Sequence, residues 1–137
     1  MIRNSTVIVG RKTYEEISNI LSDPIARIWN AQVIVMSRDP DYQVRHQQAK
    51  SATSLDDALS KARFQPICVL GGAEIYREVL ACENLVDRME LTEIDRNYGE
   101  EGVCFPEFNL DDWNRSLLEE CETQSGVQYR FIRFDRK

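Results

Sequence analysis

The sequence predicts an α/β protein with a mainly parallel mixed sheet, flanking helices and a C-terminal antiparallel hairpin. Through the first two thirds of the chain, short apolar strands alternate with helix-spaced segments, an order typical of a parallel sheet covered on both faces. The last third carries two extended stretches around the turn Gln124-Ser125-Gly126. A length of 137 residues, with 42% hydrophobic and 29% charged, is ordinary for one globular domain. We therefore expect residues 1–137 to form a single domain.

The first strand and helix meet at a glycine, in the segment Val7-Ile8-Val9-Gly10-Arg11-Lys12-Thr13-Tyr14-Glu15-Glu16. The glycine keeps the turn open to a ligand, and Thr13 with Glu16 has the Thr-x-x-Glu spacing of a helix capping box. The two cations then lie beside a helix N-terminus, which attracts anions. This order is typical of a phosphate site, and it also fits a well-capped helix with solvated cations.

The elements that follow are assigned from apolar runs and helix caps. We expect strands at residues 33–36, 67–70, 88–94, 116–122 and 127–134. A helix at residues 13–21 links the first two strands. Ser54 and Asp57 cap a second helix, and Gly71 and Gly72 open a third. This alternation of strands and helices again favours a parallel sheet in the first part of the chain.

Two further turns of the phosphate-binding type follow predicted strands. Ser37 and Arg38 offer a hydroxyl and a guanidinium, which grips phosphate oxygens bidentately. Gly71 and Gly72 would let a ligand touch bare backbone amides. Each turn alone also fits a purely structural role. Three such turns at the carboxyl edge of one sheet form the usual crevice for a dinucleotide.

Composition excludes several classes of function. With 17 Lys and Arg against 23 Asp and Glu, the net charge of −6 opposes broad binding of nucleic acid or of an anionic membrane. The single histidine, His46, and four cysteines without a Cys-x-x-Cys pair argue against a metal site. No apolar run reaches the roughly 18 residues of a membrane span, and the first residues show no secretory signal. We therefore expect a cytoplasmic protein with reduced thiols.

Four segments, in order, resemble dihydrofolate reductases. They are Val7 to Glu15, Val33 to Pro40, Val69 to Tyr76, and Leu91 to Asp95 followed by Phe105-Pro106 and Asp111-Asp112-Trp113. The resemblance covers nearly the whole chain except residues 18–32. It implies transfer of a hydride from NADPH to the pterin ring of dihydrofolate.

The resemblance also implies the cofactor contacts. Arg11 and Arg38 with Ser37 would hold the adenosine 2′-phosphate, while Lys12 and Thr13 would meet the phosphates at the helix start. The second group of implied cofactor residues surrounds the remaining turns and comprises Gly10, Gly71, Gly72, Ala73, Glu74, Ile75 and Tyr76. In the family the two consecutive glycines are joined by a cis peptide bond and accept the pyrophosphate and nicotinamide side, and the tyrosine lies near the nicotinamide.

The substrate residues follow from the same resemblance. Ile17 would pack against the benzoyl ring, and the Leu70 carbonyl would face the pterin. Thr92 would hydrogen-bond both the pterin side and the catalytic acid, so Thr92 and Tyr76 are the residues implied nearest the chemistry. The arginine that pairs with the substrate's glutamate carboxylate falls in the altered region, where Arg27 is the candidate.

The chain departs from the family pattern at two places. The loop Glu101-Gly102-Val103-Cys104 differs from the family before Phe105-Pro106. In addition, six residues precede Val7, whereas the family there has a central strand, a loop over the nicotinamide and a helix with the catalytic acid. We expect that the domain is N-terminally incomplete as given, or that a partner or a repaired sheet supplies the strand. We do not expect Glu93 to replace the acid, because alternate strand residues face opposite sides and Glu93 should point away from Thr92.

Three functions remain open at this point. The first is a dihydrofolate reductase whose acid is absent from this chain, acting as a monomer or with a partner. The others are a noncatalytic NADPH-binding relative and an interaction module that uses the same fold. A related riboflavin-pathway reductase shares the architecture, but the Phe-Pro and Asp-Asp-Trp segment argues against it.

Overall fold

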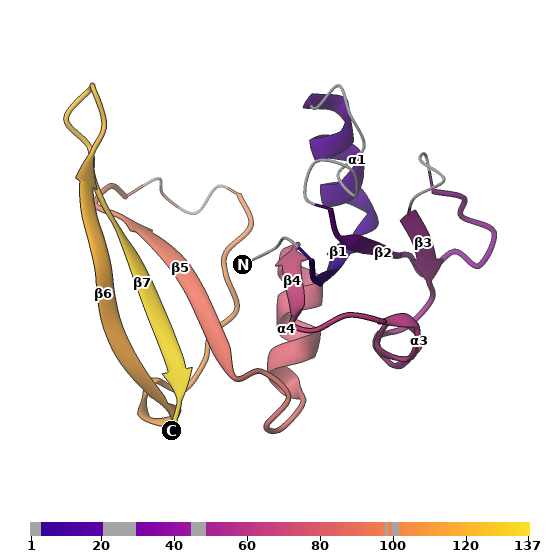
Figure 1. Cartoon of the computed structure of the whole chain (residues 1–137). Helices are drawn as coiled ribbons and strands as arrows, with labels where there is room; N and C mark the ends of the chain where they lie inside the picture. Colours follow the sequence, from indigo (N-terminus) through magenta and orange to yellow (C-terminus); the bar gives the residue numbers. More distant parts are fainter. Residues whose placement is uncertain (1–3, 21–29, 45–48, 98, 100–101) are drawn as a thin grey trace. The chain divides into compact units, whose positions relative to one another are not determined.

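The computed structural model describes residues 4–20, 30–44, 49–97, 99 and 102–137. It divides the chain into two compact units, Met1–Glu78 and Val79–Lys137. Each unit is built around its own sheet, one parallel and one antiparallel (Figure 1).

The first unit contains a four-stranded parallel sheet with the order β3-β2-β1-β4. Its elements are β1 (Thr6–Gly10), α1 (Arg11–Ile20), β2 (Gln32–Met36), β3 (Ala49–Ala52), α3 (Leu55–Lys61), β4 (Ile67–Gly71) and the start of α4 (Ala73–Ala81). Ile8 of the central strand β1 pairs with Ile34 on one side and with Val69 on the other. This confirms the predicted parallel sheet and its alternation with helices.

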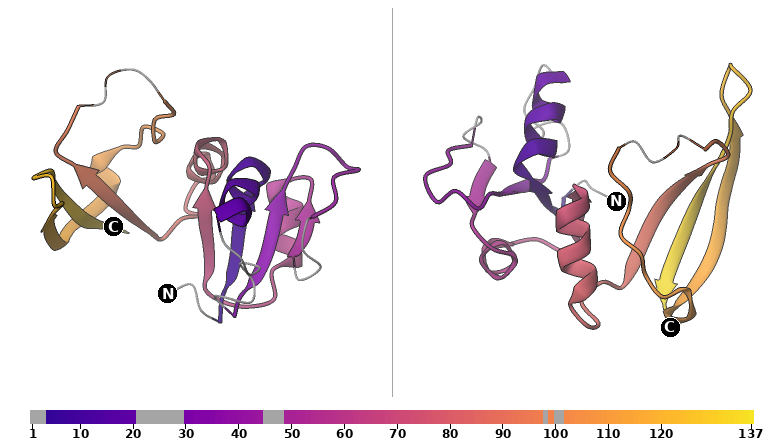
Figure 2. Two further views of the ribbon diagram at one scale, coloured as in Figure 1. Left: turned by 90° about the horizontal axis from the view of Figure 1, so that it is seen from above. Right: turned by 180° about the vertical axis from the view of Figure 1, so that it is seen from behind.

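The core of the first unit forms because β1 and β2 are apolar on both faces. Val9, Val33 and Val35 share one face, where the buried Tyr14 of α1 packs against them. Ile8 and Ile34 point to the other face by strand alternation, and all five aliphatic side chains are at most 1% exposed. Figure 2 shows α1 and α3 on opposite sides of this sheet, the arrangement that right-handed crossovers in opposite directions produce.

Two local expectations need correction in this unit. The first helix begins at Arg11, directly after β1, so Thr13 lies inside its first turn and the capping-box hypothesis is wrong. The short strand β3 was not anticipated, because Ala49 and Ala52 are its buried residues and are too small to give an apolar run. In contrast, Ser54 caps α3 as expected, since its side chain accepts a hydrogen bond from the Asp57 N–H.

The second unit contains a three-stranded antiparallel sheet with the order β5-β7-β6. Its elements after α4 are β5 (Arg88–Ile94), the 3₁₀ turn η1 (Leu110–Asp112), β6 (Trp113–Glu122) and β7 (Gln128–Arg136). The predicted hairpin turn is confirmed, since the Gly126 N–H donates to the Thr123 carbonyl and the Thr123 N–H donates to the Val127 carbonyl. The antiparallel strands form a sheet of their own, because β5 pairs with β7 and β4 pairs with β1.

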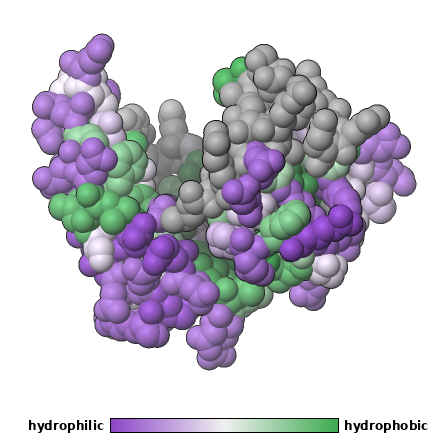
Figure 3. All heavy atoms as spheres, viewed as in Figure 1, coloured by the Kyte–Doolittle hydropathy of each residue, from purple (hydrophilic) through white to green (hydrophobic). Residues whose placement is uncertain are grey.

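One face of the antiparallel sheet carries the core of this unit. Met89, Trp113, Ile132 and Phe134 are buried on it. Two aromatic residues from the segment before β6, Phe105 and Phe108, pack against them, and Phe108 meets Phe134 edge to face at 5.3 Å between ring centroids. The other face is more open. Figure 3 shows hydrophobic side chains at the surface midway along this sheet, and the exposed hydrophobic residues of the unit include Leu118 and Phe131.

Candidate functional site

The three turns singled out in the sequence lie at one edge of the parallel sheet. β2, β1 and β4 are neighbouring parallel strands, and they end at Met36, Gly10 and Gly71. Each strand end leads directly into one of the turns. The carboxyl edge of such a sheet is where nucleotides bind in open α/β folds.

The two glycine turns touch each other. A Cβ atom added to Gly10 would lie 3.3 Å from Ile75 Cγ1 and 3.4 Å from both the Gly71 carbonyl oxygen and the Gly72 nitrogen. A Cβ atom added to Gly72 would lie 3.2 Å from Thr13 Oγ1. The start of α1 and the start of α4 therefore approach each other so closely that side chains at these positions would fill the space between them.

The peptide bond between Gly71 and Gly72 is cis, as the resemblance implies, and Gly71 has a φ of 127°. The Tyr76 N–H donates to the Gly72 carbonyl at 3.0 Å, which starts α4. The Tyr76 hydroxyl would lie 3.4 Å from a Cβ atom on Gly71. Burial raises the pKa of the Tyr76 phenol. The structure thus brings Tyr76 to the same turn as the two glycines.

The first cations of α1 are at the surface. Arg11 and Lys12 are exposed, and the Arg11 guanidinium lies 5.8 Å from the centre of the Tyr42 ring. The pKa of the Tyr42 phenol is raised by burial and, to a smaller extent, by the Glu15 carboxylate. Tyr42 also packs against the core of the parallel sheet. It therefore supports Arg11 from the loop after β2, a role that sequence spacing alone did not indicate.

The turn after β2 is held by its backbone and its serine. The Ser37 N–H donates to the Ala52 carbonyl at 2.9 Å, and Ser37 Oγ accepts from the Asp39 N–H at 3.2 Å. Arg38 reaches towards α4, where its Nη2 lies 3.7 Å from Oε2 of Glu74. Both of these side chains are largely exposed, at 92% for Arg38 and 76% for Glu74. The turns after β2 and β4 therefore meet through an ion pair.

The implied substrate residues of the first unit lie near the same sheet. Leu70 is the extra residue of a bulge between β1 and β4, since Ile8 pairs with Val69 and Val9 pairs with Gly71. The bulge leaves Leu70 outside the β1–β4 register. Ile17, on α1, is partly buried and packs against the core. Arg27 lies outside the described residues, so its placement stays a prediction.

Thr92 lies in the second unit, on the open face of the antiparallel sheet. It pairs with Phe131, which in turn pairs with Glu119. These side chains belong to a depression of about 430 Å³. The depression is lined by Glu90, Leu91, Thr92, Leu118, Glu119, Phe131 and Ile132. Because it belongs to the second unit, this depression contains none of the residues implied for the cofactor.

Glu93, the neighbour of Thr92, is engaged by two arginines. Its Oε2 accepts hydrogen bonds at 3.3 Å from both Arg115 Nη2 and Arg130 Nη1. Arg130 also donates to Asp95 at 2.9 Å. Glu93 pairs with Arg130 in the strand register while Thr92 pairs with Phe131, so the two neighbours point to opposite faces. This agrees with the expectation that Glu93 points away from Thr92.

In the described part of the chain, no helix has the length and apolar character needed to cross a membrane. Nor do the residues placed by the structure include a group of three or more His, Cys, Asp or Glu side chains suited to a metal ion.

Comparison with known proteins identifies the family. The model of the dihydrofolate reductase family matches residues 1–136. The chain belongs to the dihydrofolate reductase family. Among curated proteins, it is similar to the dihydrofolate reductase HdrB of Haloferax volcanii, with 29% identity over 136 residues. It is also similar to dihydrofolate reductases of Aedes albopictus, with 26% identity over 145 residues, and of Buchnera aphidicola, with 29% over 125 residues.

These matches cover most of this chain but less of the relatives. They include 96%, 98% and 90% of this chain, and 64%, 75% and 70% of the three relatives, respectively. The family and its mixed α/β fold agree with the resemblance read from the ordered segments.

Proposed function

We propose that this chain binds NADPH and dihydrofolate and takes part in the reduction of dihydrofolate to tetrahydrofolate. The observation that carries the proposal is the close approach of the two glycine turns where β1 and β4 end. Gly10 faces the Gly71–Gly72 backbone and the Ile75 side chain, and Gly72 faces the Thr13 hydroxyl. Membership of the dihydrofolate reductase family supports it. When bound, NADPH supplies the hydride.

The chain's own residues would bind and orient the cofactor. Arg11 and Arg38, with the Ser37 hydroxyl, carry the positive charge and the hydrogen-bond donor that suit a phosphomonoester such as the 2′-phosphate. Lys12 and Thr13 lie in the first turn of α1, where the helix dipole favours anions. These residues therefore suit a dinucleotide that carries a 2′-phosphate, such as NADPH, better than they suit NADH.

The remaining cofactor contacts would come from the start of α4. Gly71 and Gly72 would admit the pyrophosphate, and Tyr76 would lie beside the nicotinamide. This segment also includes Ala73, Glu74 and Ile75. Ile75 Cγ1 would lie 3.3 Å from a Cβ atom added to Gly10.

The substrate contacts would come from the residues that the family resemblance implies. The Leu70 carbonyl, outside the strand register, is suited to accept a hydrogen bond from the pterin. The Thr92 hydroxyl would orient the pterin side, Ile17 would contact the benzoyl ring, and Arg27 would pair with the substrate carboxylate. We further propose that the catalytic acid is not among residues 1–137.

Two other expectations stay predictions. One is a cytoplasmic location, and the other is the supply of a central strand by a partner.

The experiment that tests this proposal compares two cofactors that differ by one phosphate. We expect the chain to bind NADPH more tightly than NADH in fluorescence titrations, because Arg11 and Arg38 can pair with the additional charge. Arg38→Ala should lose most of that preference, on the order of ten- to a hundred-fold, because a hydrogen bond between charged groups contributes about 1.5–3 kcal/mol.

Arg63→Ala is the matched control. Arg63 is exposed and precedes β4, so it lies at the opposite end of that strand from the glycines. Arg63→Ala changes the net charge by the same amount as Arg38→Ala, and it should leave the preference for NADPH over NADH unchanged. Equal affinities for NADPH and NADH, insensitive to Arg38→Ala, would refute the proposed function.

A further inference from the structure

The ion pair between Arg38 and Glu74 joins two residues of the proposed cofactor site. Arg38 follows β2, and Glu74 stands in the first turn of α4. Since β1 lies between β2 and β4 in the sheet, the pair spans the carboxyl end of the central strand. The carboxylate therefore lies where a ligand phosphate would meet Arg38.

The carboxylate and a phosphate compete for the same partner. A guanidinium binds either anion in the same bidentate manner. The two negative charges also repel each other when both are near Arg38. In the first turn of α4, Glu74 is favoured by the helix dipole, so its negative charge is stabilised at this position. An acid placed there acts against binding of the 2′-phosphate.

We propose that Glu74 is a specificity-determining residue that weakens the preference for NADPH by pairing with Arg38 when the cofactor is absent. The inference rests on the proposed cofactor site and changes the role of Glu74 within it from a ligand contact to a competitor. NADH has no 2′-phosphate, so its affinity does not depend on this competition. The chain's discrimination between the two cofactors is thus smaller than its arginines alone would give.

The test is the charge-removing variant Glu74→Gln, which keeps the size of the side chain. We expect its affinity for NADPH to rise roughly two- to five-fold, the range that an exposed ion pair supplies, while its affinity for NADH stays the same. Adenosine 2′,5′-bisphosphate, compared with adenosine 5′-monophosphate, should show the same difference without the nicotinamide.

Two comparisons make the test specific. Glu78→Gln removes the same charge one turn further along α4 and should change the NADPH affinity less than Glu74→Gln does. In an Arg38→Ala background, Glu74→Gln should give no gain in NADPH affinity, because the guanidinium for which Glu74 and the phosphate compete is absent. A gain of equal size in that background would show general repulsion and would overturn the inference.

The outcomes separate this inference from the proposed function. If the wild-type chain prefers NADPH through Arg38 but Glu74→Gln leaves the ratio of affinities unchanged, the inference is wrong and the cofactor site stands. If the wild-type chain shows no preference and Arg38→Ala has no effect, the proposed function fails and the inference fails with it.

Discussion

Gly72 faces the side chain of Thr13 across the gap between α4 and α1. A methyl group there would meet Thr13 Oγ1 at 3.2 Å, a tight contact that a small shift of the hydroxyl relieves. Gly72→Ala should therefore lower the free energy of unfolding by about 1 kcal/mol, the lower end of the usual cost of overpacking. The same methyl group would enter the proposed space for the pyrophosphate. We expect the stabilisation by NADPH to fall sharply, as measured by thermal unfolding with and without the cofactor.

Gly126→Ala is the control for this prediction. Gly126 lies in the β6–β7 turn of the second unit with a φ of 87°, where any side chain is strained. This variant should lose intrinsic stability while keeping its response to NADPH. If Gly72→Ala behaves in that way instead, Gly72 is a structural glycine and has no part in binding.

Single residues were predictable where the backbone dictates their place. Gly10, Ser37 and Gly71 lie at the carboxyl ends of strands that were predicted to be parallel, so their meeting at one edge could be expected from the sequence. The pairing of Arg38 with Glu74 could not, because it depends on how far two exposed side chains reach across β1. The contact of Arg11 with Tyr42 was missed because Tyr42 reaches Arg11 from the loop after β2, which the sequence does not place.

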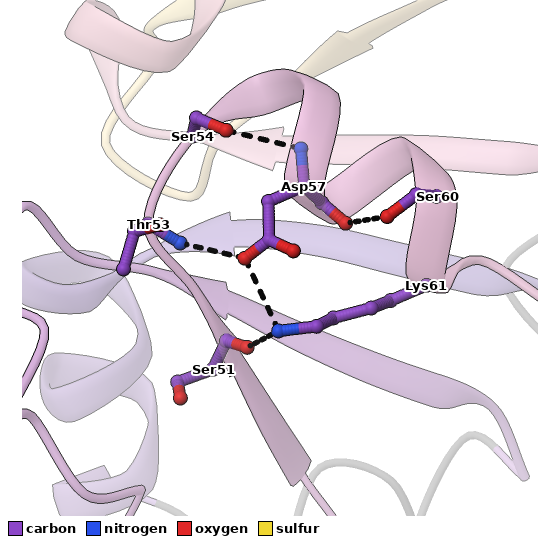
Figure 4. A network of polar contacts seen from close by, with 6 residues as sticks. All are labelled: Ser51, Thr53, Ser54, Asp57, Ser60 and Lys61. Carbon is purple, nitrogen blue, oxygen red and sulfur yellow. Dashed lines mark hydrogen bonds and ion pairs between the residues drawn. The ribbon is translucent and has the colours of Figure 1, made fainter.

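At the scale of elements, α3 shows how a short helix is fixed at its first turn. Figure 4 shows the Ser54 hydroxyl accepting from the Asp57 N–H at 3.0 Å, while the Asp57 carboxylate accepts from the Thr53 N–H at 3.1 Å and pairs with Lys61 at the same distance. The Thr53 N–H, and secondly Lys61, hold the pKa of Asp57 below its ordinary value of 3.8. Both partners therefore favour the charged form of this carboxylate.

This network predicts the cost of removing the cap. Ser54→Ala should lower the free energy of unfolding by about 1 kcal/mol, because the first turn of a seven-residue helix loses its side-chain acceptor. Ser60→Ala is the matched control, since the Ser60 hydroxyl donates to the Asp57 carbonyl within the helix at 2.7 Å and caps nothing. Urea unfolding at pH 7 measures both. Equal losses would mean that the cap does not secure α3.

The elements themselves were predictable where their residues are apolar or carry caps. β1, β2 and β4 are nearly continuous aliphatic runs, and α3 has a Ser-x-x-Asp start. β3 was missed because its buried residues, Ala49 and Ala52, bury little surface. This strand forms by pairing with β2, which the local sequence does not indicate. The start of α1 was placed two residues late, because Thr13 looks like a cap in sequence but faces Gly72 in the structure.

At the scale of the whole molecule, the proposed reaction depends on an acid near the pterin. Within residues 1–137, the carboxylate that follows Thr92 in the chain is Glu93, and it is held by Arg115 and Arg130 on the other face of β5. A positioned acid contributes on the order of 10²- to 10⁴-fold to a reaction that needs a proton. We therefore expect NADPH binding and catalysis to be separable in this chain, which keeps a noncatalytic cofactor-binding role as the second candidate.

We expect residues 1–137 to consume NADPH with dihydrofolate at a rate near background, even where they fold and bind the cofactor. Fusing the first strand, covering loop and acid-bearing helix of a dihydrofolate reductase ahead of Val7 should raise the rate sharply, because that segment brings an acid and excludes water from the nicotinamide. Stopped-flow absorbance follows both chains. If the 137-residue chain turns over as fast as the fusion, the acid lies among residues 1–137. Glu93→Gln in the shorter chain would then abolish turnover if Glu93 is that acid, and its ion pairs with Arg115 and Arg130 would have to open during the reaction.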